Sequence, residues 1–184
     1  MIVSQRCEWV QDKPAYYISY HDQVWGKPEH RDRYLFKYLL METFHTGLSW
    51  QLVLSKEAEF EKAFDGFDYR VIAHYQSDKV ASLLMNQGII RHRGKIEASI
   101  KNAQAFLQVQ ADYGSFDHFI WSFTQGQVVE RQPGEELAKW SDLSDQVTKV
   151  LKTYGFKYIG SVTIYSYLQA IGVINDHDLN CSFR

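Results

Sequence analysis

A glutamate within an apolar helical stripe is the first residue of this sequence that could do chemistry. Leu35, Leu39 and Glu42 follow the i, i+4, i+7 spacing of one helix face, so Glu42 projects where a core-facing helix carries apolar side chains. A carboxylate buried alone is costly, and it must therefore be paired, hydrogen-bonded or functional. Glu42 is either the floor of a pocket, with the turn at residues 47–50 as its rim, or a core-edge residue that reaches water or an arginine.

Two cysteines and two histidines near opposite ends of the chain form a candidate metal site. Cys7 and His21 precede the first long helix, and His177 and Cys181 lie in the C-terminal tail. Two thiolates and two imidazoles suit tetrahedral Zn²⁺. Because four protein ligands leave no open position, such a zinc would be structural and would join the two termini. The alternative is four unrelated core or surface residues. The H-x-E and P-C-x-x-C pattern of zinc-dependent deaminases does not occur in the sequence.

Two basic segments are candidate contacts for a DNA backbone. Lys149, Lys152 and Lys157 surround a glycine-bounded hairpin, with no acidic residue between Lys149 and Ile174. Backbone N–H groups at the start of the helix after this hairpin could bind phosphate. The same residues could equally form an ordinary hairpin of two helices. The second segment, residues 91–95, is most simply a solvated loop.

The elements that must position these residues are predicted to be helices. Asp32 and Ser49 are expected to cap helices, and Gly47 to separate them. Apolar spacing predicts helices over residues 32–46, 49–64 with a break near Ser55, 69–75, 77–85, about 96–113, 115–123, 141–154 (capped by Ser141 or Ser144) and 162–171. The first thirty residues show no sustained helical period and are expected to form an irregular arm with one helical turn at most. Residues 128–129 could form a brief strand. The sequence therefore predicts an all-α fold in which residues 1–184 form one domain of two helical lobes that share a core.

Composition and charge narrow the class of protein. The 184 residues are 45% hydrophobic and 23% charged, which is typical of globular proteins. No apolar run approaches the ~18–20 residues that cross a bilayer, and the first six residues lack the layout of a signal peptide. We therefore expect a cytoplasmic protein with no membrane partner, in which a disulfide is not the use of the two cysteines. The net charge of −2 neither indicates nor excludes binding to nucleic acid, because a local basic patch matters more than the total.

Seven groups of residues together carry a resemblance to a known family. They are Cys7-x-Trp9, Tyr20-His21-Asp22-x-x-Trp25-Gly26, Glu42, Gly47-Leu48-Ser49-Trp50, Gly88-Ile89-Ile90-Arg91-His92-Arg93-Gly94-Lys95-Ile96, Gly155-Phe156-Lys157-Tyr158-Ile159-Gly160 and Asn175-Asp176-His177-x3-Cys181. Their order is similar to that of the 3-methyladenine DNA glycosylase I family, over nearly the whole chain. Several groups are long and specific, which favours the metal and DNA interpretations over their alternatives.

The resemblance implies a helix-hairpin-helix DNA glycosylase with a structural zinc. Such an enzyme flips 3-methyladenine out of alkylated double-stranded DNA and cleaves its N-glycosidic bond with water, leaving an abasic site. The family uses no lysine nucleophile, so the DNA strand is not cleaved. We expect a monomer that binds Zn²⁺ through Cys7, His21, His177 and Cys181.

The resemblance also implies which residues bind the flipped base. Glu42 would be the catalytic residue, because its carboxylate attracts the cationic base and accepts hydrogen bonds from its amino edge. Tyr20 would be the polar partner of Glu42. Trp50, Tyr17 and Trp9 would form stacking walls around the base.

DNA contacts outside the base pocket follow from the same resemblance. Gly47 and Leu48 would fill the gap that the flipped nucleotide leaves in the duplex. The hairpin at residues 155–161 would hold the phosphates through Lys157, Gly160 and Ser161.

The sequence departs from the family pattern beside Glu42. Thr43, Phe44 and His45 stand where the family usually carries a small residue and then a glutamine, so base specificity is the property most affected. Asp176 lies where an aspartate of the wider superfamily stabilises the sugar cation, although the neighbouring zinc ligand explains it equally well. Two other classes remain open: a damage-binding protein without turnover, and a zinc-stapled nucleic-acid-binding module of other purpose.

Overall fold

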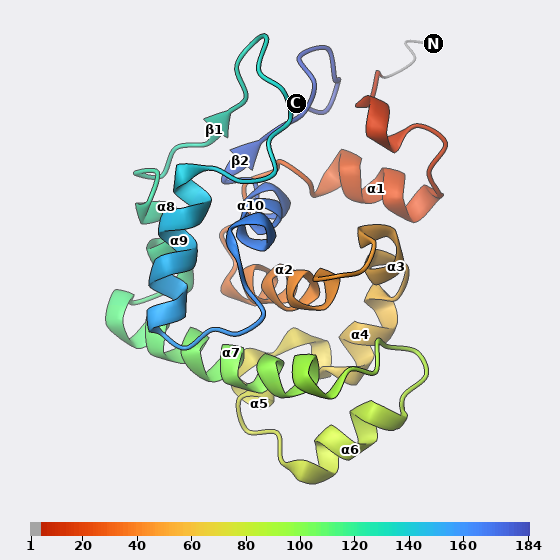
Figure 1. Ribbon diagram of the computed structural model, residues 1–184, viewed down its shortest axis with the longest axis vertical. Coiled ribbons are helices and arrows are strands. Elements are labelled where there is room, and N and C mark those ends of the chain that lie inside the picture. The colour runs from red at the N-terminus through yellow and green to blue at the C-terminus, as the bar shows by residue number, and fades with distance from the viewer. Residues whose placement is uncertain (1–4) are drawn as a thin grey trace.

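Ten α-helices make up most of residues 5–184, the part of the chain that this computed structural model describes (Figure 1). Residues 1–4, which were part of the signal-peptide argument, lie outside the described residues. The helices are α1 (Ala15–Gln23), α2 (Asp32–His45), α3 (Trp50–Ser55), α4 (Glu57–Ala63), α5 (Tyr69–Ile72), α6 (Ser77–Met85), α7 (Arg93–Tyr113), α8 (Phe116–Ser122), α9 (Asp142–Thr153) and α10 (Ser161–Ala170). Two 3-10 helices, Glu8–Val10 and Asp65–Phe67, and two short strands complete the described elements. The sequence predicted an all-α fold; the described residues are mostly helical, with one pair of two-residue strands beside the helices.

Helix α2 lies at the centre of the molecule and packs against α3, α7, α8 and α10 (Figure 1). Nine of its fourteen residues are buried, including Glu42. A helix that is buried on most of its circumference belongs to the core rather than to the surface. Phe36 and Phe44 extend this core in two directions, since Phe36 packs on Phe106 of α7 and Phe44 packs on Phe60 of α4. The stripe that suggested a core-facing helix is therefore real, and the helix is buried on more than that one face.

The N-terminal segment is more regular than the sequence indicated. Instead of an irregular arm, it contains the nine-residue helix α1, which packs against α3. The carbonyl of Pro14 accepts hydrogen bonds from the N–H groups of Tyr17 and Ile18 and so starts the helix. The prediction was wrong because the buried residues of α1 are Tyr20 and His21, which do not produce an aliphatic stripe.

Asp32 has a different role from the predicted helix cap. It is the first residue of α2, after the N-cap residue Arg31, whose side chain makes no capping hydrogen bond. The Asp32 carboxylate instead accepts hydrogen bonds from the N–H groups of Phe116, at 3.0 Å, and Asp117, at 2.8 Å. It therefore pairs backbone N–H groups at the N-terminus of α8 that would otherwise lack an acceptor. The partners lie more than eighty positions apart in the sequence, so local spacing cannot reveal the contact. Ser49, by contrast, caps α3 as predicted.

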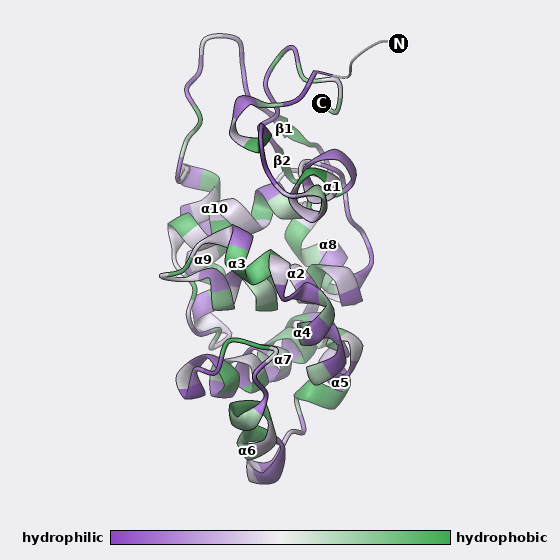
Figure 2. Ribbon diagram, turned by 90° about the vertical axis from the view of Figure 1, so that its right-hand side faces the viewer, coloured by the Kyte–Doolittle hydropathy of each residue, from purple (hydrophilic) through white to green (hydrophobic). Residues whose placement is uncertain are grey.

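The two strands pair near the end of the molecule that also carries both termini (Figure 2). Strand β1 (Val129–Glu130) runs parallel to β2 (Ile174–Asn175). The expected strand was placed one residue early, and its partner was not predicted, because two residues are too few to show a period of two. The pairing fastens the long loop before α9 to the C-terminal segment. In the same view α6 lies at the opposite end of the molecule.

The remaining helix boundaries lie close to the predicted ones. Ser141 and Ser144 form a reciprocal capping box at the start of α9, so both candidate caps take part. The break near Ser55 separates α3 from α4. Within residues 5–184, no helix has both the length and the apolarity that crossing a bilayer requires.

Gly172 is the position at which the C-terminal end of α10 meets the segment before α2. Its φ is +71°, and a Cβ there would overlap the backbone of Lys27 and Pro28. We expect Gly172→Ala to lower the free energy of unfolding by about 1–3 kcal/mol for overpacking, in addition to the cost of a left-handed alanine. Urea denaturation measures the loss.

Gly114→Ala is the matched control for this prediction. Gly114 has a similar φ of +86°, but nothing lies within 4 Å of a Cβ built there. The control should therefore carry only the backbone cost of about 1 kcal/mol. Equal losses in the two variants would show that the contact with Lys27 and Pro28 is unimportant.

Candidate active site and metal centre

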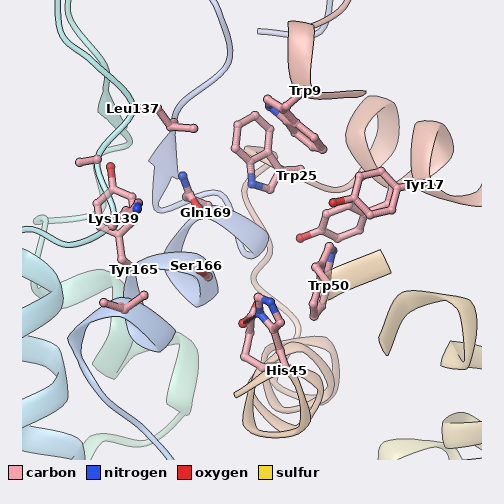
Figure 3. A pocket seen from close by; sticks show the side chains of 14 residues that line it. Trp9, Tyr17, Trp25, His45, Trp50, Leu137, Lys139, Tyr165, Ser166 and Gln169 are labelled. Atoms are coloured by element: carbon pink, nitrogen blue, oxygen red, sulfur yellow. Dashed lines mark hydrogen bonds and ion pairs between the residues drawn. The ribbon is translucent and has the colours of Figure 1, made fainter. Parts of the chain in front are cut away.

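A cavity of about 230 Å³ lies between α1, α2, α3, α10 and the loop before α9 (Figure 3). The structure brings all five predicted base-binding residues to this cavity: Trp9, Tyr17, Tyr20, Glu42 and Trp50. They come from four elements of the chain: the 3-10 helix Glu8–Val10 supplies Trp9, and α1, α2 and α3 supply the other four residues. Their grouping is a result of the tertiary structure, because these elements meet through contacts between separate segments of the chain.

Aromatic rings form one wall of the cavity. Trp9 meets Tyr17 with ring centroids 5.7 Å apart and planes at 82°, and Tyr20 meets Trp50 at 5.3 Å and 56°. These edge-to-face and tilted arrangements leave ring faces available for stacking with a planar ligand. The indole Nε1 of Trp50 is buried and has no hydrogen-bond partner among residues 5–184. An unpartnered buried donor at a cavity favours a polar ligand there.

Glu42 is only 2% exposed, and its carboxylate faces the cavity together with His45. Burial raises the pKa of Glu42, while a hydrogen bond from His45 opposes that rise. The Nδ1 of His45 lies 2.8 Å from Oε2 of Glu42. The polar partner of this carboxylate is thus His45, and the interpretation of Tyr20 as its hydrogen-bond partner is not supported. Burial, followed by the nearby charge of Glu42, raises the pKa of Tyr20 well above its usual value, so its hydroxyl keeps its proton.

The three residues that depart from the family pattern do not share one environment. Thr43 is completely buried, and its hydroxyl donates to the carbonyl of Leu39. Phe44 is also completely buried, and its ring packs against Phe60 and Phe64. Only His45 reaches the cavity. Of the three residues, His45 is therefore the one that can contact a ligand in the cavity directly.

Sequence reasoning missed the opposite wall of the cavity. Leu137 and Lys139 come from the loop before α9, and Tyr165 and Gln169 come from α10 (Figure 3). The i, i+4 spacing of Tyr165 and Gln169 was the one available signal, since it places both on a single helix face. Nothing in the loop sequence marks Leu137 or Lys139, because their position depends on how the loop crosses the core.

The four candidate metal ligands meet in a buried cluster. The ligating atoms of Cys7, His21, His177 and Cys181 all lie within 4.8 Å of one another. Sγ of Cys181 is 3.7 Å from Nε2 of His21 and 3.3 Å from Nδ1 of His177, and Sγ of Cys7 is 3.4 Å from the same Nδ1. Tetrahedral zinc with ordinary bond lengths separates its ligand atoms by about 3.3–3.8 Å. The three sulfur–nitrogen distances fall in this range, so the four residues form a possible metal-binding group, and its cysteines are not joined in a disulfide.

The surroundings of the cluster orient both imidazoles toward its centre. Nδ1 of His21 lies 2.7 Å from the carboxylate of Asp22, and Nε2 of His177 lies 2.9 Å from the carbonyl of Trp25. Because these oxygens only accept, each ring carries its proton on that nitrogen and directs the other lone pair inward. Burial lowers the pKa of His177 to about 4 and raises the pKa of Cys7 to about 12. Burial thus favours the neutral forms of Cys7 and His177, and a divalent cation is the kind of ligand that would ionise a buried thiol.

The predicted hairpin connects α9 to α10. The side chain of Asn102 on α7 fixes this hairpin through two hydrogen bonds to the backbone of Lys157. Its amide oxygen accepts from the Lys157 N–H, and its amide nitrogen donates to the Lys157 carbonyl. Gly160 is the N-cap residue of α10, and the hydroxyl of Ser161 lies 2.7 Å from that of Ser144. The side chain of Lys157 is exposed. The hairpin is therefore rigidly attached to the core and presents the start of α10 at the surface.

Lys95 differs from its neighbours in the basic segment. Arg91 and Arg93 are exposed, as expected of a solvated loop, whereas Lys95 is only 5% exposed. Its Nζ donates to the carbonyls of Phe44, at 2.8 Å, and Thr46, at 2.5 Å. Lys95 therefore satisfies carbonyls at the C-terminal end of α2, next to Glu42 and His45, where a positive charge is favourable.

Comparison with known proteins agrees with this geometry. The model of the methyladenine glycosylase family matches residues 9–184, which is almost the whole chain. The chain belongs to the methyladenine glycosylase family. It is 41% identical to the DNA-3-methyladenine glycosylase 1 of Escherichia coli (strain K12), over 96% of this chain and 95% of that protein. It is 37% identical to the DNA-3-methyladenine glycosylase of Haemophilus influenzae, over 97% of both chains.

A solved structure of the same family supports the architecture. The 3-methyladenine DNA glycosylase I of Staphylococcus aureus, solved to explain recognition of 3-methyladenine, is 36% identical and superposes with a TM-score of 0.92. The match covers 96% of this chain and 95% of that one. The methyladenine glycosylase fold is thus shared over nearly the whole length.

The buried contact of Lys95 predicts a stability loss that a surface lysine would not show. Lys95→Met removes the donor from two carbonyls at the end of α2, so we expect unfolding to become easier by about 1–3 kcal/mol. Lys101→Met on the same helix is the control, because Lys101 is exposed. Urea denaturation of both variants tests this. A loss in Lys101→Met as large as that in Lys95→Met would contradict the assigned role.

Proposed function

We propose that this protein is a monofunctional DNA glycosylase that excises 3-methyladenine from alkylated double-stranded DNA and leaves an abasic site for base excision repair. The names of its relatives support the substrate, and one observation supports the mechanism: a buried carboxylate, Glu42, at the floor of an aromatic cavity. One chain supplies the whole cavity and the whole metal cluster, which is consistent with a monomer.

Glu42 would recognise the charge of the damaged base. Methylation at N3 makes the adenine cationic, so the base is already a good leaving group and needs little acid catalysis. An ionised carboxylate that is 2% exposed attracts that cation and accepts hydrogen bonds from its amino edge. A normal, neutral adenine gains far less from the same carboxylate. The charge-assisted hydrogen bond, worth about 1.5–3 kcal/mol, would thus contribute directly to discrimination.

The aromatic wall would hold the flipped base out of the duplex. Stacking on Trp50, Tyr17 and Trp9 contributes about 1–3 kcal/mol per base and offsets the loss of stacking in DNA. Tyr20, which retains its proton, would donate to the base from the same wall.

The DNA outside the base pocket would be contacted at two places around the cavity. Gly47 has a φ of +79°, and Leu48, which is 39% exposed, follows it in the turn beyond Glu42. Leu48 would enter the gap left by the flipped nucleotide. The α9–α10 hairpin would act as the helix-hairpin-helix element, with Lys157, Gly160 and Ser161 meeting a phosphate at the N-terminus of α10.

The Cys2His2 cluster would bind a structural Zn²⁺ through Cys7, His21, His177 and Cys181. The ligand spacing and the imidazole orientations fit that ion. The four residues fill its coordination sphere, so the ion would contribute stability and leave catalysis to Glu42.

Glu42→Gln tests the central role of the carboxylate. The change keeps the shape but removes the charge, so the rate of 3-methyladenine release should fall by roughly 10- to 150-fold, the equivalent of one charge-assisted hydrogen bond. Single-turnover assays on methylated duplex DNA measure the rate, with Glu61→Gln, an exposed glutamate of α4, as the control.

The same assay separates the alternatives. Tight binding of methylated DNA by the wild-type protein with no release of base would support a damage-binding module instead of an enzyme. Strand cleavage without alkali would contradict the monofunctional mechanism. An unchanged rate of excision by Glu42→Gln would contradict the proposed role of the Glu42 carboxylate in recognising the base.

Cys181→Ser tests the zinc proposal. The serine cannot supply a thiolate, so the purified variant should contain less zinc and melt at a lower temperature, whereas the specific activity of the folded fraction should change less. Metal analysis and thermal melting are compared with wild-type protein before and after treatment with a chelator. A wild-type protein that keeps its full thermal stability after zinc removal would contradict a structural role for the metal.

A further inference from the structure

His45 is the one residue that both departs from the family pattern and reaches the cavity. Its Nδ1 lies 2.8 Å from Oε2 of Glu42, in an i, i+3 pair on the last turn of α2. Because an ionised carboxylate only accepts hydrogen bonds, Nδ1 must carry the proton of that bond. In a neutral imidazole Nε2 then holds a lone pair, and it has no hydrogen-bond partner within residues 5–184.

We propose that His45 is a second recognition residue, and that only its neutral form allows Glu42 to bind a cationic base. This inference rests on the proposed function. In the neutral form, Glu42 keeps its full negative charge toward the ligand, and Nε2 of His45 adds an acceptor for the exocyclic amino group of the base. In the protonated form, the imidazolium neutralises Glu42 and opposes the charge of the base.

The other groups around the pair do not compensate for this change. Tyr17 and Tyr20 on α1 and Tyr165 on α10 all have raised pKa values, mainly because of burial, so they stay neutral near pH 7. Lys139, on the loop before α9, lines the far side of the cavity. Lys95 lies behind the helix end and donates to the carbonyls of Phe44 and Thr46. The Glu42–His45 pair is therefore the place in the cavity where one added proton changes the charge that would face the base.

The substrate cannot be the source of such a pH effect. In DNA, the methyl group on N3 gives the adenine a positive charge that does not depend on protonation. The rate of excision should therefore follow the fraction of protein with an unprotonated Glu42–His45 pair. Below the midpoint of that titration, a single proton reduces the active fraction by about tenfold per pH unit.

A pH profile of single-turnover excision tests this inference. Wild type, His45→Gln and the control His118→Gln are assayed on methylated duplex DNA from about pH 5 to pH 8, the range in which histidine changes charge. His118 is an exposed residue of α8 and does not line the cavity. Samples without protein correct for spontaneous loss of the base, and each profile is scaled to its own rate at the highest pH.

We expect the acid limb of His45→Gln to lie at lower pH than that of wild type and His118→Gln. The pair accepts its first proton more readily than Glu42 does beside an uncharged amide, because the pair offers two sites for it. NMR titration of the His45 ring in the wild type should give a midpoint that coincides with its acid limb. This second measurement decides the question if His45→Gln has no activity at any pH.

The outcomes separate the inference from the proposed function. No excision by the wild type at any pH means that the proposed function is wrong. Excision with the same acid limb in wild type and His45→Gln, or a His45 titration that does not coincide with the wild-type limb, overturns the role of His45 alone.

Discussion

The burial of one carboxylate, that of Glu42, is the physical constraint on which the arrangement of the cavity depends. Glu42 sits on the central helix and is 2% exposed, so its negative charge must be balanced from within the protein or by a ligand. The protein supplies one hydrogen bond, from His45, and raises the pKa of Glu42 through burial. The side of the carboxylate that faces the cavity is left for a ligand, and a cation satisfies it better than a neutral molecule.

Buried polar contacts from α7 fix the C-terminal end of α2, the helix that carries Glu42. Lys95 binds carbonyls on both sides of His45, and Asn102, on the same helix as Lys95, contacts the hydroxyl of Thr43 and the backbone of Lys157. Helix α7 therefore fixes the end of α2, the turn with Leu48 and the α9–α10 hairpin relative to one another. In the proposed function, recognition of the base and of the DNA backbone would therefore depend on the same buried polar contacts, which are costly to break.

The metal cluster and the aromatic wall are also one structure. Trp9 lies against His21, and Trp25 lies against both Trp9 and His177, with ring centroids 4.7–5.2 Å apart. Residues from both ends of the chain meet here, and β1 and β2 pair at the same end of the molecule (Figure 1). A zinc ion at this point would hold the N-terminal helix against the body of the protein, and with it Tyr17 and Tyr20 of the cavity.

The sequence by itself determined the mostly helical fold, the family, one wall of the cavity with Glu42, and the four residues of the cluster. Periodicity and capping residues act within a few positions, and the family strings mark positions such as Glu42 and His177 directly. Tertiary structure alone decided that Asp32 satisfies α8, that Lys95 is buried at the end of α2, and that Leu137 and Lys139 close the cavity. It also decided that Thr43 and Phe44 face the core while His45 faces the cavity. Each of these contacts depends on which segment, distant in the sequence, lies beside the side chain. The packing of the helices and their rotation against one another determine that segment.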